Sequence, residues 1–233
     1  DGLIDAGETI ELSLPLRNRG GATGVGVTAT MTSLSAFVSV SDATSSYPAI
    51  GAGALVNPSD PIVLTVDRMA PDRTEAKVHL AYVSGATTVE EDIILYVHAP
   101  VFEWHRMFVR DTTGTGNSNS IVEPNEDVRL RVELRNGGLG QAQSIIGKLR
   151  ATDPVFVVTD SVVDFGTIAG NARAISQPFP DTFGFQMTDT TGAWESSHRM
   201  FVTLYDTYSP STPLATILVD PVGPLQAISN LKS

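Results

Sequence analysis

The stretch GETIELSLPLRNRG (Gly7–Gly20) recurs later in the chain as NEDVRLRVELRNGG (Asn125–Gly138). Each version begins with an acidic residue close to its start, continues as an alternating apolar run and closes on Leu-Arg-Asn-x-Gly. The closing asparagines, Asn18 and Asn136, are 136 − 18 = 118 positions apart. One chain therefore carries the same segment twice.

The correspondence extends beyond this segment. At the same offset it continues without a gap to Ile50 and Ile168, and later apolar runs still correspond after short insertions between them. Loops tolerate such insertions, whereas packed cores do not. The chain therefore holds two copies of one domain, which we place at residues 1–99 and 100–220, with residues 221–233 as a tail or the start of a further module.

Apolar residues occupy every second position of the repeated segment. They are Ile10, Leu12, Leu14 and Leu16 in the first copy and Val128, Leu130, Val132 and Leu134 in the second. This period places the apolar set on one face of a β-strand. Roughly seven such short strands in about 100 residues, without a helical stripe, are typical of an immunoglobulin-like sandwich. We predict an all-β chain with two tandem immunoglobulin-like antiparallel β-sandwiches. The closing turns at Asn18–Gly20 and Asn136–Gly138 supply residues that tolerate positive φ in a tight turn.

The two copies differ at their beginnings. Residues 100–111 precede the second repeat and alternate in polarity, which predicts a lead strand, whereas the first copy shows no counterpart. The tail at 221–233 begins Pro-Val, as the lead-in at 100–111 does. Two explanations stay open: the chain is a piece of a longer tandem array, or the tail of one subunit fills the open edge of the next in a filament.

Composition narrows the possible partners. The 233 residues carry a net charge of −11, which argues against nucleic acid or an anionic membrane surface as a partner. No apolar run approaches the roughly 20 residues of a membrane span, so no membrane insertion is expected. The absence of Cys excludes a disulfide scaffold and cysteine-based metal or redox chemistry.

The start of each repeat also carries a nameable pattern. DGLIDAGE at residues 1–8, followed by LSLPLRNRG at 12–20, resembles the bacterial and archaeal extracellular immunoglobulin-like modules of the CARDB type, which are similar to fibronectin type III domains. The resemblance implies an extracellular or cell-surface location. It also implies a structural or interaction role as a stalk, spacer, adhesive part or assembly unit, whose partners are copies of itself or neighbouring modules head to tail.

Acidic and amide residues cluster at the turn before each repeated strand. The candidate metal ligands are Asp1, Asp5 and Glu8 in the first copy and Asn117, Asn119, Glu123 and Glu126 in the second. Carboxylate and amide oxygens at irregular spacing around glycines suit Ca²⁺. The alternative is that Glu8 and Glu126 accept backbone N–H groups and only brace the turn.

No catalytic constellation is evident from the sequence. The four histidines are scattered without metal-ligand spacing, and no G-x-S-x-G motif is present. We therefore expect no enzyme activity and no required cofactor, with Ca²⁺ as the one candidate ion.

Candidate interface residues lie in the second copy and in the tail. They are Trp194, in a Gly-containing loop, and the tail residues Val222, Leu225, Ile228 and Leu231. The function that we expect first is that of a structural module of a secreted or cell-surface protein, which spaces or displays other parts or polymerises outside the cell. The alternative is an adhesin or carbohydrate-binding module that uses loops around Trp194 and Asn117 to bind a glycan or a surface protein.

Overall fold

The computed structural model describes residues 2–176, 178, 182–188, 199–207 and 211–219. The chain divides into two compact units, residues 1–99 and 100–233. Each unit has its own hydrophobic core. The described residues contain strands and turns and no helix, so none of them forms a helix that could cross a membrane.

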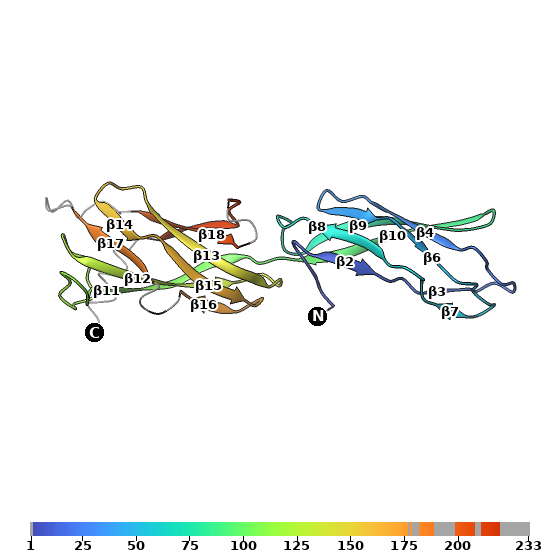
Figure 1. Ribbon diagram of the computed structural model, residues 1–233, viewed down its shortest axis with the longest axis horizontal. Coiled ribbons are helices and arrows are strands. Elements are labelled where there is room, and N and C mark those ends of the chain that lie inside the picture. Colours follow the sequence, from blue (N-terminus) through green and yellow to red (C-terminus); the bar gives the residue numbers. More distant parts are fainter. Residues whose placement is uncertain (1, 177, 179–181, 189–198, 208–210, 220–233) are drawn as a thin grey trace. The chain divides into compact units, whose positions relative to one another are not determined.

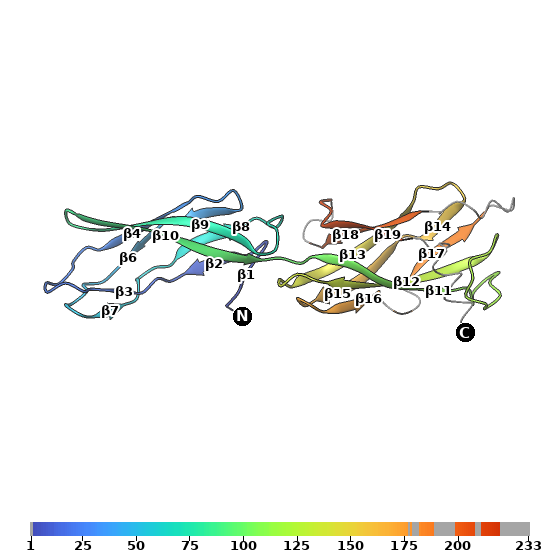
Figure 2. The same ribbon diagram turned by 180° about the vertical axis from the view of Figure 1, so that it is seen from behind.

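The first unit is a sandwich of two sheets (Figures 1 and 2). One sheet has the order β1-β10-β9-β4-β6, and the other is formed by β2-β8-β5 together with the short pair β3-β7. The strands are β1 (Ile4–Asp5), β2 (Thr9–Leu12), β3 (Leu16–Arg17), β4 (Thr28–Ser33), β5 (Val38–Asp42), β6 (Thr44–Ser46), β7 (Leu55–Val56), β8 (Ile62–Val66), β9 (Thr74–Ser84) and β10 (Thr87–His98). All pairs are antiparallel except the two-residue pairing of β1 with β10.

The second unit repeats this arrangement with two differences: it adds β11 beside β12, and it has no strand at the position of β1. Its sheets have the orders β15-β13-β18-β19 and β11-β12-β17-β14, with β16 also paired to β12. The strands are β11 (Phe102–Arg110), β12 (Asp127–Asn136), β13 (Ala142–Ala151), β14 (Phe156–Asp160), β15 (Val162–Ile168), β16 (Arg173–Ile175), β17 (Phe183–Met187), β18 (Met200–Asp206) and β19 (Ala215–Val219). The predicted fold class, two tandem immunoglobulin-like antiparallel sandwiches, is confirmed.

The period-two pattern of the repeated segment corresponds to burial. In β12, Leu130 and Leu134 are fully buried, and the charged residues between the apolar positions are mostly less buried. The first copy has Pro15 at the position of Glu133 in β12. Proline has no N–H to donate to a ladder, and here the segment splits into the short strands β2 and β3.

The closing turns do not use the positive φ that their residues tolerate. No residue of Asn18–Gly20 or Asn136–Gly138 has a positive φ. The asparagine acts through its side chain instead. Because this side chain ties the turn to distant backbone groups, the turn does not depend on a left-handed residue.

Asn136 is fully buried and saturated with hydrogen bonds. Its Nδ2 donates to the carbonyl oxygens of Gly140 (2.8 Å), Ile168 (3.3 Å) and Ala169 (3.2 Å), and its Oδ1 accepts from the amides of Val101 (3.0 Å) and Gly138 (3.1 Å). Asn18 makes three bonds of the same kind, to Ala22 and Ile50 through Nδ2 and from the Gly20 amide through Oδ1. The asparagine of the repeat is therefore a structural bridge, with more partners in the second copy.

Truncation at equivalent core positions should have unequal effects. Leu130→Ala removes a fully buried side chain and should lower the free energy of unfolding by about 2–5 kcal/mol, because it leaves a cavity. Leu12→Ala should cost less, since Leu12 is only partly buried. Urea unfolding followed by circular dichroism measures both variants, and tryptophan fluorescence isolates the second copy, which holds Trp104 and Trp194. Equal costs would contradict the burial difference.

The two bridging asparagines provide a second matched pair. Asn136→Ala should lower the free energy of unfolding by about 3–5 kcal/mol, because it leaves several buried backbone groups without a partner. Asn18→Ala should cost about half as much, because fewer bonds are lost and the site is less buried. Thermal unfolding of both variants tests this order, and a milder effect at Asn136 than at Asn18 would refute it.

Candidate functional site

The outer edge of the repeated strand differs between the two units. In the second unit, β12 pairs with β11 on one edge and with β17 and β16 on the other. In the first unit, β2 and β3 pair only with β8 and β7, so among the described residues their outer edge has no strand partner. This edge matches the edge of β12 that β11 covers.

Burial of the apolar face follows the pairing. At the four apolar positions of the repeat, the second-unit residues are at most 1% exposed, whereas the first-unit residues are only partly buried. The second-unit residues are Val128, Leu130, Val132 and Leu134, and their first-unit counterparts are Ile10, Leu12, Leu14 and Leu16. From β11, Phe102, Met107 and Val109 pack against the second core. The first-unit edge thus has the sequence of a core strand without the cover that its counterpart has.

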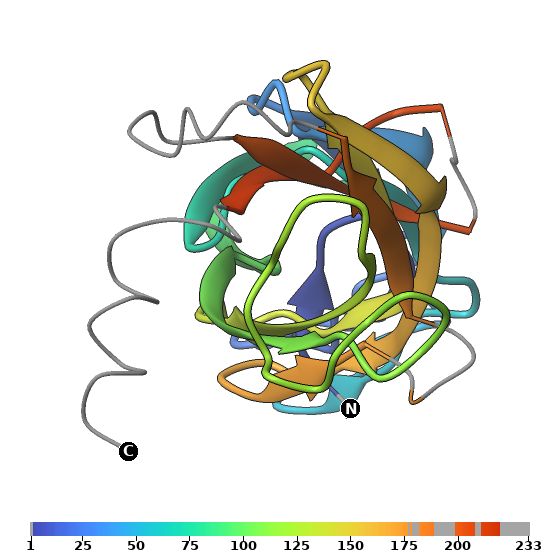
Figure 3. The same ribbon diagram turned by 90° about the vertical axis from the view of Figure 1, so that its left-hand side faces the viewer.

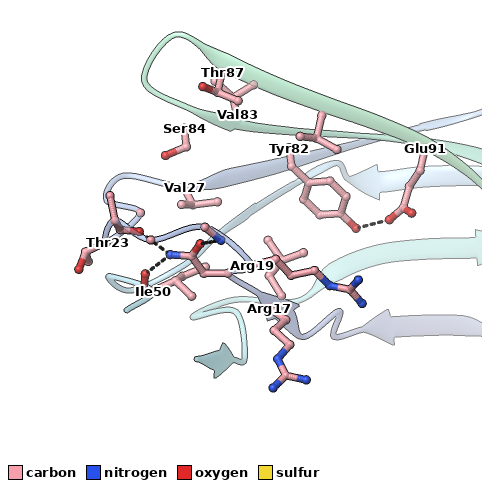
Figure 4. Close-up of a pocket in the computed structure, with 17 residues that line it drawn as sticks. Arg17, Arg19, Thr23, Val27, Ile50, Tyr82, Val83, Ser84, Thr87 and Glu91 are labelled. Atoms are coloured by element: carbon pink, nitrogen blue, oxygen red, sulfur yellow. Dashed lines mark hydrogen bonds between the residues drawn. The ribbon is translucent and has the colours of Figure 1, made fainter. Parts of the chain in front are cut away.

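A groove lies along part of this edge, between β3 and the β9–β10 hairpin (Figure 4). Its volume is about 770 Å³. The lining residues come from two places, residues 16–24 with Val27 and Ile50 on one side, and Tyr82, Val83, Ser84, Thr87, Val89 and Glu91 on the other. Val89 is 58% exposed, so the groove presents apolar surface to solvent.

Polar groups border this apolar surface. The ring of Tyr82 projects from β9 into the space between the sheets, and its hydroxyl donates to Glu91 Oε1 at 3.1 Å (Figure 4). Burial, together with the Glu91 carboxylate, raises the pKa of Tyr82, so this phenol stays protonated and able to donate. On the opposite side, Arg17 Nε donates to the Gly53 carbonyl at 3.4 Å. The groove therefore combines an apolar floor with a cationic and an anionic side.

The second unit shows what fills the matching region. There β11 contacts both β12 and β19, which correspond to β2–β3 and β10 of the first unit. Glu103 of β11 forms an ion pair with Arg135, the counterpart of Arg17, at 3.5 Å. Around Trp104 and Arg106 the β11 register shifts by a bulge, opposite Glu133, the position that Pro15 holds in the first copy. A bulged strand of this kind suits an edge whose ladder is interrupted by proline.

The acidic turn of the second copy is a compact loop at one end of the unit, between β11 and β12 (Figure 3). Asp111, which the sequence analysis did not select, is fully buried, and its carboxylate accepts the amides of Asn119 (2.9 Å) and Ser120 (3.2 Å). The side-chain amides of Asn117 and Asn119 both donate to Glu123 Oε2. The structure therefore brings Asn117, Asn119 and Glu123 together, as a shared site requires.

Glycines make this loop compact. A Cβ built on Gly116 would lie 1.7 Å from the Asp111 carbonyl oxygen, and one on Gly114 would lie 1.8 Å from Asp127 Oδ2. A side chain at Gly116 would collide with backbone, and one at Gly114 would displace the Asp127 side chain. Asp127 also accepts a hydrogen bond from Gln186 Nε2 through Oδ1. The sequence signal that would have found Asp111 is the Gly-rich segment directly after it, which packs back on to it.

The equivalent turn of the first copy is built differently. Glu8 is exposed, and its Oε2 accepts the amide of Asp5 at 3.1 Å, which is the bracing role considered from the sequence. Asp1 lies outside the described residues. Within the described residues, no three His, Asp or Glu side chains already converge as a metal-binding cluster.

The remaining candidates fall elsewhere. Trp194 and the tail residues Val222, Leu225, Ile228 and Leu231 lie outside the described residues. His79 in β9 contacts Asp92 of β10 at 2.7 Å, beside Lys77 at 2.6 Å from the same carboxylate. Hydrogen bonds from these two side chains lower the pKa of Asp92. This group is a cross-strand contact on the sheet surface.

Comparisons with known proteins show distant structural likeness. No protein-family model matches the sequence, and no curated protein matches it. A protein of unknown function from Porphyromonas gingivalis W83 is 14% identical with a TM-score of 0.27, and the match covers 94% of this chain and 93% of that one. The Pseudomonas aeruginosa CupB2 chaperone is 11% identical with a TM-score of 0.25, over 94% and 96% of the two chains. Bovine butyrophilin is 11% identical with a TM-score of 0.24, over 94% and 93%. TM-scores this low carry no argument about function.

Proposed function

We propose that this chain is a structural and interaction module that associates by strand addition at the outer edge of β2 and β3. The observation that carries the proposal is the unequal burial of one repeated apolar face, complete under β11 in the second unit and partial in the first. An unpaired sandwich edge offers backbone N–H and C=O groups to an incoming strand. The extracellular or cell-surface location is part of the proposal and rests on the motif resemblance.

The chain itself indicates what kind of strand fits. β11 supplies large apolar residues at alternating positions, with Glu103 facing the arginine that corresponds to Arg17. An incoming strand for the first unit should therefore be extended and apolar on one face. Backbone hydrogen bonds supply the affinity in such addition, and the side-chain pockets supply register.

The donor in this proposal is the segment 221–233 of another copy. It begins Pro-Val like the lead-in of the second copy and carries the apolar residues Val222, Leu225, Ile228 and Leu231. A head-to-tail contact of this kind does not close on itself and generates a filament.

The full chain should then form concentration-dependent oligomers, and a chain ending at residue 220 should stay monomeric with both sandwiches folded. Sedimentation velocity and electron microscopy measure this. A full chain that stays monomeric at every concentration would refute the head-to-tail donor.

Strand addition can be tested apart from the donor. A synthetic peptide of residues 100–111, the strand that covers the second unit, should bind the chain ending at 220. Val89→Asp should weaken this binding about tenfold or more, because it places a carboxylate in the apolar groove. Leu34→Asp is the matched control, since Leu34 is 57% exposed and does not line the groove. Fluorescence anisotropy of the labelled peptide gives both affinities, and equal affinities in the two variants would place the peptide elsewhere.

A further inference from the structure

We propose that the loop from Asp111 to Asp127 binds one Ca²⁺, with the carboxylates of Glu123 and Glu126 as charged ligands and the amide oxygens of Asn117 and Asn119 as neutral ones. This site lies in the second unit and does not depend on strand addition at the first. The proposal concerns a specific loop of one copy, and it leaves the corresponding turn of the first copy without an ion.

The observation that points to a cation is an unpartnered buried oxygen. Glu126 is 6% exposed, and its Oε2 has no hydrogen-bond partner within the described part of the chain. A buried carboxylate is unfavourable unless it is paired, hydrogen-bonded or neutralised. Its counterpart Glu8 is exposed and bonded to a backbone amide. The same residue of the repeat is thus satisfied in one copy and left with an open acceptor in the other.

The surroundings of Glu126 are negative. Burial and the nearby carboxylates of Glu123 and Asp111 raise the pKa of Glu126, although hydrogen bonds from the backbone of Glu123 and Asn117 lower it in part. The atom without a partner is Oε2 alone. Between Asp111 and Asp127 the sequence has four carboxylates and no Lys, Arg or His. None of these carboxylates forms an ion pair with a described residue. A bound cation would supply the positive charge that the described residues do not provide there.

The ligand chemistry selects calcium. The loop offers only oxygen ligands, without the His or Cys side chains that zinc and other transition metals prefer. Ca²⁺ accepts irregular sets of six to eight oxygens, whereas Mg²⁺ demands a near-ideal octahedron and gives up water reluctantly.

Ion binding requires only local rearrangement. Asn117 and Asn119 now direct their side-chain nitrogens at Glu123 Oε2, where a cation would sit. Both side chains are exposed, but the Oδ1 of Asn117 accepts the Asn119 amide at 3.1 Å and the Oδ1 of Asn119 accepts the Ile121 amide at 2.7 Å. Each side chain therefore has to exchange one such bond when its oxygen turns toward the ion. Asp111 holds the loop through the amides of Asn119 and Ser120 and acts as a positioning residue.

The full chain allows a direct test, because Trp104 and Trp194 both belong to the second copy and their fluorescence follows its unfolding. Calcium chloride should raise the melting midpoint of this transition by about 10 °C when calcium exceeds the dissociation constant a hundredfold. We expect a dissociation constant of about 0.1–1 mM, as in extracellular calcium modules. EGTA should reverse the shift, and magnesium chloride at the same concentration should produce much less of it.

Two variants separate a specific site from a general salt effect. Glu126→Gln should abolish the calcium-dependent shift, whereas Glu8→Gln, the same change at the counterpart in the first copy, should keep it. A third variant, Asn117→Ala at an exposed position, should weaken calcium binding about tenfold in calorimetry, which keeps the test available if Glu126→Gln fails to fold.

No shift at about 10 mM calcium, or a full shift in Glu126→Gln, would overturn the proposal. Neither result would affect peptide binding at the first unit, so the two proposals fail separately.

Discussion

The rest of this structure depends on one constraint, that the apolar face of the repeated strand has to be covered while both of its edges find hydrogen-bond partners. In the second unit β11 meets both needs, since it extends the sheet beyond β12 and sends Phe102, Met107 and Val109 on to the core. In the first unit the corresponding face is only partly covered by described residues, and a groove follows part of the edge. The difference concerns which strand covers the face, since the apolar pattern is the same in both copies.

Pro15 shows how the first copy tolerates this condition. A long unpaired edge with a continuous ladder of N–H and C=O groups promotes uncontrolled association. Pro15 interrupts that ladder between β2 and β3, where β12 continues through Glu133. In the second unit, β11 has a bulge opposite Glu133, the position of Pro15. A partner strand with a bulge at this point is therefore compatible with the interrupted ladder of the first unit. An edge of this form disfavours flat, regular strands and still admits a bulged one, which favours selective strand addition.

The sequence was sufficient to predict the fold, but it was not sufficient to predict which strand edge is uncovered or which acidic side chain is buried. A period of two fixes which residues share a face, so the strands around Leu12 and Leu130 and the duplicated sandwich could be predicted. Period alone does not report how completely a face is covered, because coverage depends on a strand distant in sequence. The bridging role of Asn136 could not be predicted for a similar reason. Asparagine suits both a left-handed turn and side-chain bridging, and only the positions of Ile168 and Ala169 decide between them.

The acidic turns show the same limit at a finer scale. Glu8 and Glu126 occupy one position of the repeat, yet one is exposed and bonded to a backbone amide, and the other is buried with an open acceptor oxygen. Only the second copy has the preceding loop after Asp111, whose glycines let the backbone fold tightly against Asp111 and Asp127. A duplicated domain therefore did not duplicate its chemistry. The positions shared by both copies set the sandwich, while β11, which only the second copy has, determines which edge is closed.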